Sequence, residues 1–134
     1  MTDANKGTLY AVYGTLRKGF GNYRYLLSNP EEADFIGEMK TEPKFKMVSL
    51  SGFPGVIVDS KDGKTAIVVE IFRVKTKELE RRLDNLEGYP HFYNKTQIDT
   101  AWGKANMYIL PNEKYGDYKE VVSGDWKQYI SERK

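Results

Sequence analysis

The sequence predicts an α+β fold in which helices pack outside a curved sheet or barrel. Short apolar stretches bounded by Gly, Pro and Asn recur along the chain, as in strands joined by turns. Residues 76–88 instead carry leucines at helical spacing. The resulting order is a strand, a short helix, several strands, a helix, two strands and a closing helix, without repeats or linkers. This order is typical of an α+β fold, and we expect one domain over residues 1–134.

The first half of the chain is expected to be mostly antiparallel strands. Residues 8–12 are apolar and lie between Gly7 and Gly14, which is typical of a buried strand. Asn22 is expected to cap a short helix over residues 22–27, because an Asn side chain can accept hydrogen bonds from first-turn amides. Further strands are expected at residues 35–40, 45–50, 56–58 and 65–74.

The second half begins with an amphipathic helix. Its leucines stand four and three residues apart, with charged residues between them, and Gly88 is the expected breaker at its end. The leucines of this pattern are Leu79, Leu83 and Leu86. Strand-like alternation returns at residues 93–100 and 104–110. A closing helix is expected over residues 124–132, with Ser123 as its N-cap.

The composition is that of a folded protein with few options for catalytic chemistry. Of 134 residues, 40% are hydrophobic and 30% charged, which is enough for one core. The net charge of +2 is too small to indicate a nucleic-acid or membrane partner. The chain has no cysteine and a single histidine, His91, so we expect no metal site and no thiolate nucleophile. Without a leader-like segment or a long apolar span, the expected location is the cytoplasm.

A glycine-containing loop, Tyr13-Gly14-Thr15-Leu16-Arg17, follows the first expected strand. A phosphate-binding P-loop would need Lys and Ser or Thr after Gly19, where Phe20 and Gly21 stand. The spacing Gly19-x-Gly21 follows no strand directly and fails as a dinucleotide fingerprint as well. Two interpretations remain open. Gly14 can supply an unusual φ angle in a tight turn, or the loop can offer a cluster of backbone amides to a carboxylate or oxyanion.

Glu87 is the candidate general acid or base. It stands at the C-terminal end of the second expected helix, where the helix dipole disfavours another negative charge and raises the carboxyl pKa. Partial burial would raise this pKa further, into the range for proton exchange near neutral pH. Asp84 would add to this rise if buried, although a solvated position is expected for it. The alternative is that Glu87 is a solvated residue in the last turn of the helix. His91 is expected at the surface or at the rim of the pocket.

Two segments together carry a family resemblance. Tyr13-Gly14-Thr15-Leu16-Arg17 is followed by Gly19 and Asn22, and residues 83–89 read Leu-Asp-Asn-Leu-Glu-Gly-Tyr with Tyr93 behind them. In these segments the chain resembles the γ-glutamylcyclotransferase-like family, and its loop is more similar to the γ-glutamylamine cyclotransferase, or AIG2-like, branch. The resemblance implies a small mixed β-barrel with flanking α-helices.

The resemblance also implies roles for individual residues. Glu87 would be the catalytic acid/base, and no cofactor would be needed. The substrate-binding residues would be Tyr13, Gly14, Thr15, Leu16, Arg17, Tyr93 and Tyr108. Among these, the residues 13–16 would act through their backbone, and the two later tyrosines would form pocket walls. Arg17 would either bind a substrate carboxylate with its planar fork or brace the loop.

The implied reaction converts a γ-glutamyl amine or peptide into 5-oxoproline and a free amine or amino acid. Glu87 would take a proton from the α-amine as it attacks the γ-carbonyl, and would pass it to the leaving amine. Both reacting groups belong to one molecule, so orientation alone can supply much of the rate. The alternative is a non-catalytic small-molecule (carboxylate) binding or interaction protein on the same fold. We expect no nucleic-acid and no membrane partner, and the sequence leaves the oligomeric state open.

Overall fold

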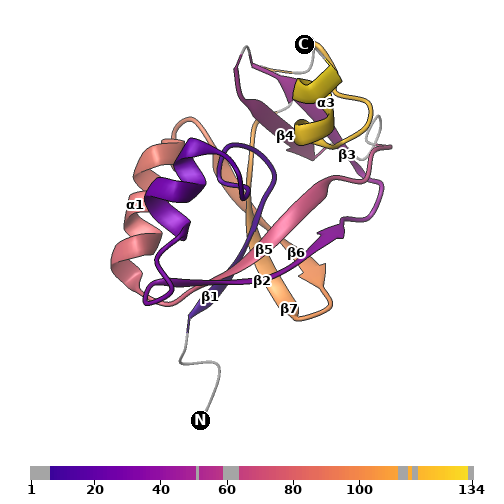
Figure 1. Cartoon of the computed structure of the whole chain (residues 1–134). Helices are drawn as coiled ribbons and strands as arrows, with labels where there is room; N and C mark the ends of the chain where they lie inside the picture. Colours follow the sequence, from indigo (N-terminus) through magenta and orange to yellow (C-terminus); the bar gives the residue numbers. More distant parts are fainter. Residues whose placement is uncertain (1–6, 51, 59–63, 112–114, 116–117, 133–134) are drawn as a thin grey trace.

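The computed structural model describes residues 7–50, 52–58, 64–111, 115 and 118–132. In this part of the chain, a five-stranded sheet carries two helices against one side and a two-stranded hairpin with a third helix at one end (Figure 1). The predicted α+β class is confirmed. None of the helices within these ranges is long and apolar enough to cross a membrane.

The five-stranded sheet has the order β2-β5-β1-β7-β6. Its strands are β1 (Thr8–Val12), β2 (Ala33–Lys40), β5 (Val68–Val74), β6 (Asn94–Thr100) and β7 (Gly103–Ile109). All neighbours are antiparallel except β1 and β7, which run parallel. The strand predictions thus hold within a few residues at their ends. The strand expected over residues 65–74 begins only at Val68. Thr65 makes an isolated bridge to Phe45.

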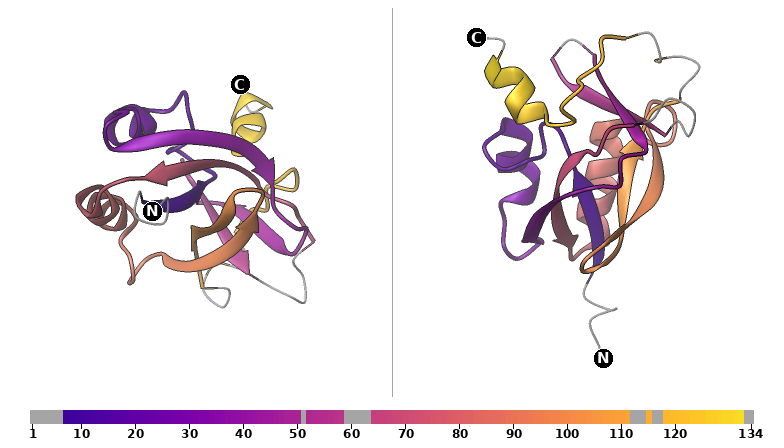
Figure 2. Two further views of the ribbon diagram at one scale, coloured as in Figure 1. Left: turned by 90° about the horizontal axis from the view of Figure 1, so that it is seen from below. Right: turned by 90° about the vertical axis from the view of Figure 1, so that its right-hand side faces the viewer.

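The sheet curls without closing. Seen from below, the strands follow a curve from β2 round to β6, and these two remain edge strands (Figure 2, left). Trp102, in the turn between β6 and β7, packs over Gly37 of β2, where any Cβ would come within 2.6 Å of the indole ring. The implied barrel is therefore an open one in the described residues: side-chain packing, and not a hydrogen-bonded ladder, brings its two edges together.

Alternation along β1 supplies both sides of the core. Tyr10 and Val12 face the side that holds the helices, whereas Leu9 and Ala11 face the side that holds the hairpin. Strands covered on both faces read as continuous apolar runs, which explains why residues 8–12 show no polar alternation. This central position places the loop after β1 between the two halves of the molecule.

The helix α1 (Lys77–Glu87) forms as predicted. The Thr76 hydroxyl oxygen accepts a hydrogen bond from the Leu79 amide at 3.0 Å, and Gly88 ends the helix with φ of 67°. Leu79 and Leu83 are fully buried against the sheet, whereas Leu86 is 44% exposed. The apolar stripe therefore anchors the first turns, and the last turn emerges at a surface opening.

The short helix η2 (Tyr23–Leu27) is π-helical and packs beside α1. The prediction that Asn22 caps it is wrong. Asn22 already has helical backbone angles and its side chain makes no cap hydrogen bond. Its amide instead donates to the Thr15 hydroxyl oxygen at 2.8 Å, so it reaches back to the loop after β1.

The hairpin of β3 (Phe45–Ser49) and β4 (Pro54–Val58) packs with the helix α3 (Trp126–Glu132) at the far end of the sheet. Trp126 is fully buried in this packing. The predicted cap of α3 is corrected: the Asp125 carboxylate accepts from the Gln128 amide at 3.3 Å, whereas Ser123 accepts from the Asp125 amide at 3.2 Å. Asp125 is therefore the residue that caps the helix.

Candidate active site

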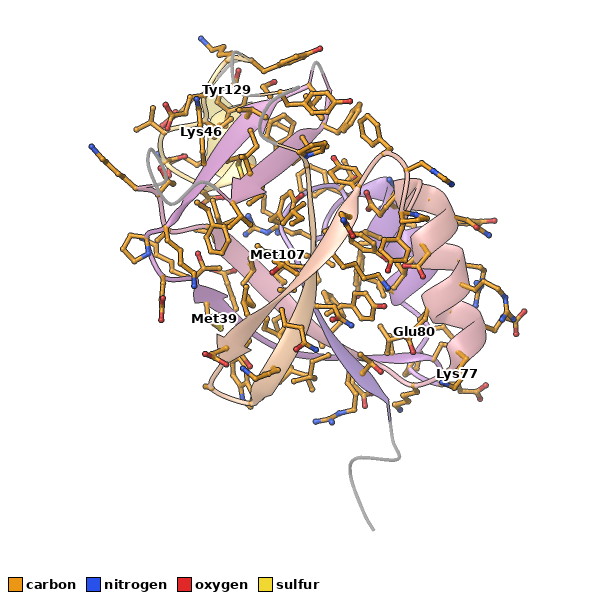
Figure 3. The ribbon with its side chains drawn as sticks, turned by 180° about the vertical axis from the view of Figure 1, so that it is seen from behind. Met39, Lys46, Lys77, Glu80, Met107 and Tyr129 are labelled. Carbon is orange, nitrogen blue, oxygen red and sulfur yellow. The ribbon has the colours of Figure 1, made fainter. Side chains whose placement is uncertain are left out.

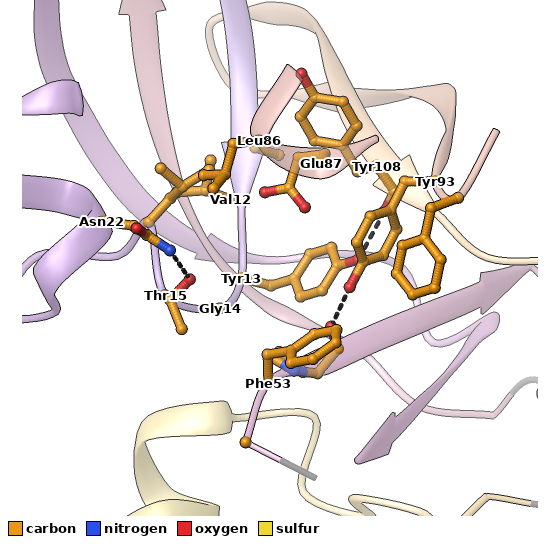
Figure 4. Close-up of a pocket in the computed structure, with 15 residues that line it drawn as sticks. Val12, Tyr13, Gly14, Thr15, Asn22, Phe53, Leu86, Glu87, Tyr93 and Tyr108 are labelled. Carbon is orange, nitrogen blue, oxygen red and sulfur yellow. Dashed lines mark hydrogen bonds between the residues drawn. The ribbon is translucent and has the colours of Figure 1, made fainter. Parts of the chain in front are cut away.

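A pocket of about 410 Å³ opens where the loop after β1, the end of α1 and the start of β4 meet (Figure 4). It is lined by Ala11, Val12, Tyr13, Gly14, Thr15, Leu16, Asn22, Gly52, Phe53, Pro54, Leu86, Glu87, Phe92, Tyr93 and Tyr108. The structure thus brings together every predicted site residue except Arg17. The lining is largely apolar, and Glu87 is the charged side chain within it.

The loop after β1 lines this pocket and has backbone amides without a described hydrogen-bond partner. The Arg17 amide donates to the Gly14 carbonyl at 3.0 Å, and the Tyr23 amide donates to the Thr15 carbonyl at 3.2 Å, which fixes the turn. The amides of Gly14, Thr15 and Leu16 make no hydrogen bond to another described residue. Because the Thr15 hydroxyl accepts from Asn22, its own proton is available as well. These donors suit a carboxylate or an oxyanion.

Gly14 is required by space and not by an unusual φ angle. The tight-turn interpretation assumed an unusual φ angle at Gly14, but Gly14 is not among the glycines with a positive φ. That assumption is corrected. A Cβ at this position would lie 2.8 Å from Cγ and 2.9 Å from Cδ of Pro54, the first residue of β4. The loop therefore lies directly against β4, and the turn and anion-site interpretations of the loop are compatible.

Glu87 is the last residue of α1, and its carboxylate points into the pocket (Figure 4). It makes no hydrogen bond or ion pair to another described residue, and its environment is mostly apolar. Burial raises the pKa of this carboxyl to about 7 from an ordinary 4.5. The rise in the Glu87 pKa agrees with the expectation from the sequence, and its cause is burial.

Asp84 is partly buried and is paired with two residues of the sheet. Its Oδ1 accepts the Tyr108 hydroxyl proton at 2.7 Å and pairs with Lys95 Nζ at 2.8 Å. The side chain is 25% exposed. The solvated position expected for Asp84 is corrected, because strands β6 and β7 supply partners that the helix pattern alone does not reveal.

Three tyrosine side chains surround Glu87 with hydroxyl protons directed elsewhere. Tyr13 donates to the Tyr108 carbonyl at 2.8 Å, Tyr93 to the Pro54 carbonyl at 2.6 Å, and Tyr108 to Asp84. Burial, with the nearby Glu87 charge, raises the pKa of Tyr93 far above its usual value. These hydroxyls therefore stay protonated, and their protons are held by partners other than Glu87. Acceptors gather around Glu87, and donors gather at the loop.

Arg17 is the predicted site residue that does not line the pocket. Its side chain is buried and points the other way: Nε donates to Glu70 Oε2 at 3.0 Å, and Nη1 donates to Asp125 Oδ1 at 3.0 Å. Glu70 Oε1 also accepts the Lys18 amide at 2.7 Å. Arg17 therefore braces the loop against β5 and α3, which was the open alternative.

Several lining residues escaped sequence reasoning. Pro54 is the first residue of β4, and Phe53 directly precedes it. Phe92 is adjacent to Tyr93 in the sequence, which is the signal that could have identified it. Asn22, which the sequence predicted as a helix cap, lines the pocket instead. His91 is exposed and does not line the pocket. No group of three or more His, Cys, Asp or Glu side chains that could hold a metal ion occurs in the described part of the chain.

The profile of the family described as gamma-glutamyl cyclotransferase, AIG2-like, matches residues 10–128. The chain belongs to this family. The family resemblance found in the sequence is thereby confirmed, and the chain is an enzyme of the γ-glutamyl cyclotransferase type. Both signature segments fall within the matched residues, and both line the pocket.

Relatives that match this chain cover most of its length. A Methanocaldococcus jannaschii protein, provisionally named a gamma-glutamylcyclotransferase, is 38% identical over 88% of this chain and 94% of its own. A Niallia circulans protein, named gamma-L-glutamyl-butirosin B gamma-glutamyl cyclotransferase, is 26% identical over 88% of this chain and 74% of its own. A crystal structure from Pyrococcus horikoshii aligns with a TM-score of 0.73 at 28% identity, covering 95% of this chain and 96% of that chain.

Proposed function

We propose that the protein cyclises a γ-glutamyl amine or peptide, releasing 5-oxoproline and a free amine, with Glu87 as general acid/base. The observation that carries this proposal is the unpaired carboxylate of Glu87, whose pKa is raised to about 7 by burial, in a pocket with the free loop donors. The relative from Niallia circulans, whose name places a γ-glutamyl group on butirosin B as its substrate, supports this class of reaction.

The polarity of the pocket orients the substrate. The γ-glutamyl group carries a cationic amine and an anionic carboxylate, and its γ-carbonyl becomes an oxyanion during reaction. The α-carboxylate or the γ-oxygen would meet the amides of Gly14, Thr15 and Leu16, and the α-amine would approach Glu87 and the lone pairs of the tyrosine hydroxyls. This arrangement folds the substrate toward ring closure.

The reaction then needs one proton carrier. Glu87 takes one proton from the bound α-ammonium, which frees the nitrogen lone pair to form a bond to the γ-carbonyl carbon, and the loop donors stabilise the oxyanion. The carbonyl re-forms as the bond to the leaving amine breaks. Glu87 gives its proton to that amine and accepts the second proton of the new ring nitrogen. No electron is gained or lost, so the step itself requires no cofactor. Effective molarities of oriented intramolecular reactions reach about 10⁵ to 10⁸ M, which makes a single carboxylate sufficient.

The charge of the pocket favours amines over amino acids as leaving groups. No Lys, Arg or His is among the lining residues described, and the one charged side chain is acidic. A departing amino acid would bring a carboxylate without a cation to meet it, whereas a departing amine brings none. Phe53, Pro54 and Phe92 offer apolar contact for the carbon chain of such an amine.

Release of 5-oxoproline from a panel of conjugates tests this function. The panel contains γ-glutamyl amines, γ-glutamyl amino acids and γ-glutamyl-ε-lysine at matched concentrations. We expect turnover with the amine conjugates and weaker or no turnover with the α-amino acid conjugates. Binding of these conjugates without 5-oxoproline release would instead support the non-catalytic binding protein.

The contact between Gly14 and Pro54 predicts a sensitive position in the loop. A Gly14→Ala substitution forces the loop and β4 apart, because its Cβ would lie 2.8 Å from the Pro54 ring. Misplacing the donors should lower kcat/KM about tenfold or more, since small shifts of positioning groups are costly. Steady-state kinetics checks this, with Gly21→Ala as the matched control because no atom lies within 4 Å of its added Cβ. Equal activity of both variants would contradict the role of the loop.

A further inference from the structure

The helix α1 presents three carboxylates toward the pocket and its neighbouring strands. Glu80, Asp84 and Glu87 are spaced four and three residues apart, which places them along one side of a helix. Figure 3 shows Glu80 between the helix and the strands, with Lys77 at the start of the helix. Glu80 accepts the Tyr10 hydroxyl proton at 2.9 Å, and Asp84 accepts from Tyr108 and Lys95. Glu87 alone among these three has no described partner.

Lys95 pairs directly with Asp84 and contacts the Tyr10 hydroxyl that donates to Glu80. It lies in β6 directly opposite Tyr108 of β7, and its side chain is 18% exposed. Its Nζ donates to the Tyr10 hydroxyl at 2.9 Å and pairs with Asp84 at 2.8 Å. The same nitrogen lies 4.5 Å from the ring centre of Tyr89, 5.1 Å from that of Tyr10 and 5.6 Å from that of Tyr108. Such a position over aromatic faces favours a cation.

Lys95 remains charged in this site. Burial alone would lower the pKa of its ammonium, but the hydrogen bonds to Asp84 and Tyr10 outweigh burial and raise it. Tyr10 stays protonated, because burial raises its pKa to about 12. The ammonium therefore neutralises Asp84 throughout the neutral pH range.

We propose that Lys95 keeps Glu87 usable as an acid/base near neutral pH, by neutralising Asp84 one helical turn away and holding it as the acceptor for Tyr108. This inference rests on the proposed function of Glu87. Lys95 does not line the pocket, so it is a positioning residue and not a catalytic one. The other titratable groups around Glu87 are Tyr13, Tyr93 and Tyr108, which stay neutral and cannot compensate for Asp84.

The sign of the effect follows from the charges. Removing the ammonium leaves an uncompensated carboxylate near Glu87, which disfavours ionisation of Glu87 and raises its pKa. Replacing Asp84 with Asn leaves an uncompensated ammonium, which favours ionisation and lowers the pKa. Losing both charges should return the pKa toward the wild-type value. A purely structural disturbance would not produce shifts of opposite sign that cancel in the double variant.

The test follows Glu87 directly by carbon-13 NMR of its side-chain carboxyl, together with the pH dependence of kcat/KM. We expect a midpoint near pH 7 in the wild type. Lys95→Met should raise it by about one pH unit, Asp84→Asn should lower it, and the double variant should restore it. Lys95→Gln serves as a second neutral variant if the first folds poorly. Lys104→Met is the matched control, because Lys104 forms an exposed pair with Asp99 at 2.7 Å away from the pocket.

The outcomes separate this inference from the function on which it rests. A Glu87 midpoint that does not move in Lys95→Met, or that stays displaced in the double variant, overturns the role of Lys95. A midpoint that moves as expected while the pH dependence of kcat/KM stays in place overturns the acid/base role of Glu87, and the charge effect of Lys95 on that carboxyl stands.

Discussion

Glu87→Gln is expected to lower kcat for 5-oxoproline release about a thousandfold, because general acid/base catalysis contributes roughly 10²-fold to 10⁴-fold. The amide has nearly the shape of the carboxylic acid but cannot take the proton from the α-amine or return it to the leaving amine. The remaining rate would come from orientation and from the loop donors, which the substitution leaves in place. Steady-state kinetics on a γ-glutamyl amine at saturating concentration measures the loss.

The fold of this variant should be intact, so the loss can be assigned to chemistry. Glu87 has no hydrogen-bond or ion-pair partner among the described residues that the substitution could break. Gln also removes the cost of burying a charge in a mostly apolar pocket. Substrate binding, measured by calorimetry, should persist within a few-fold.

Glu78→Gln is the matched control for this prediction. Glu78 lies in the first turn of the same helix, is exposed, and does not line the pocket. Its variant should keep wild-type kcat. Unchanged turnover in Glu87→Gln, with Glu78→Gln also unchanged, would remove Glu87 from the mechanism and move attention to substrate-assisted proton transfer.

Local patterns were enough to predict most of the elements, and the family resemblance added the roles that the patterns had left open for the loop after β1 and for Glu87. The leucine spacing before Glu87 and the breaker at Gly88 predicted where α1 ends, and burial at that end raises the carboxyl pKa as expected. The stretch from Tyr13 to Leu16 directly follows the central strand β1, which is buried on both faces, and this places the stretch at the pocket. Each of these features was predictable because the residues that indicate it lie within a few positions of one another.

Partners that are distant in sequence were not predictable in the same way. Asp84 meets Tyr108 and Lys95 only because the β6–β7 hairpin returns beside α1, and no spacing within the helix indicates this. Asn22 has the residue type of a helix cap, yet its side chain bonds Thr15 seven positions earlier. The pairing of charged and polar side chains depends on tertiary packing, which a single sequence does not reveal.

Arg17→Met is expected to lower the free energy of unfolding by about 3 kcal/mol, because removing one partner of a buried ion pair leaves the other charge without compensation. Arg17 and Glu70 are 2% and 3% exposed, and their side chains meet at 3.0 Å. Lys127 Nζ, 3.3 Å from the same Glu70 oxygen, retains part of the compensation, which places the loss at the lower end of the usual range. Urea denaturation measures it.

A double variant separates bracing from substrate binding. In Arg17→Met/Glu70→Leu no buried carboxylate is left unpaired at this position, so more than half of the lost stability should return, as apolar replacements of buried pairs are often tolerated. Turnover should fall in Arg17→Met because the loop donors are displaced. We expect kcat to fall and KM to rise. If Arg17 instead bound the substrate carboxylate, KM would rise alone, stability would hardly change, and the second substitution would rescue neither. The burial of Arg17 away from the pocket favours the first outcome, because a guanidinium already held by Glu70 and Asp125 has no free edge to offer a ligand.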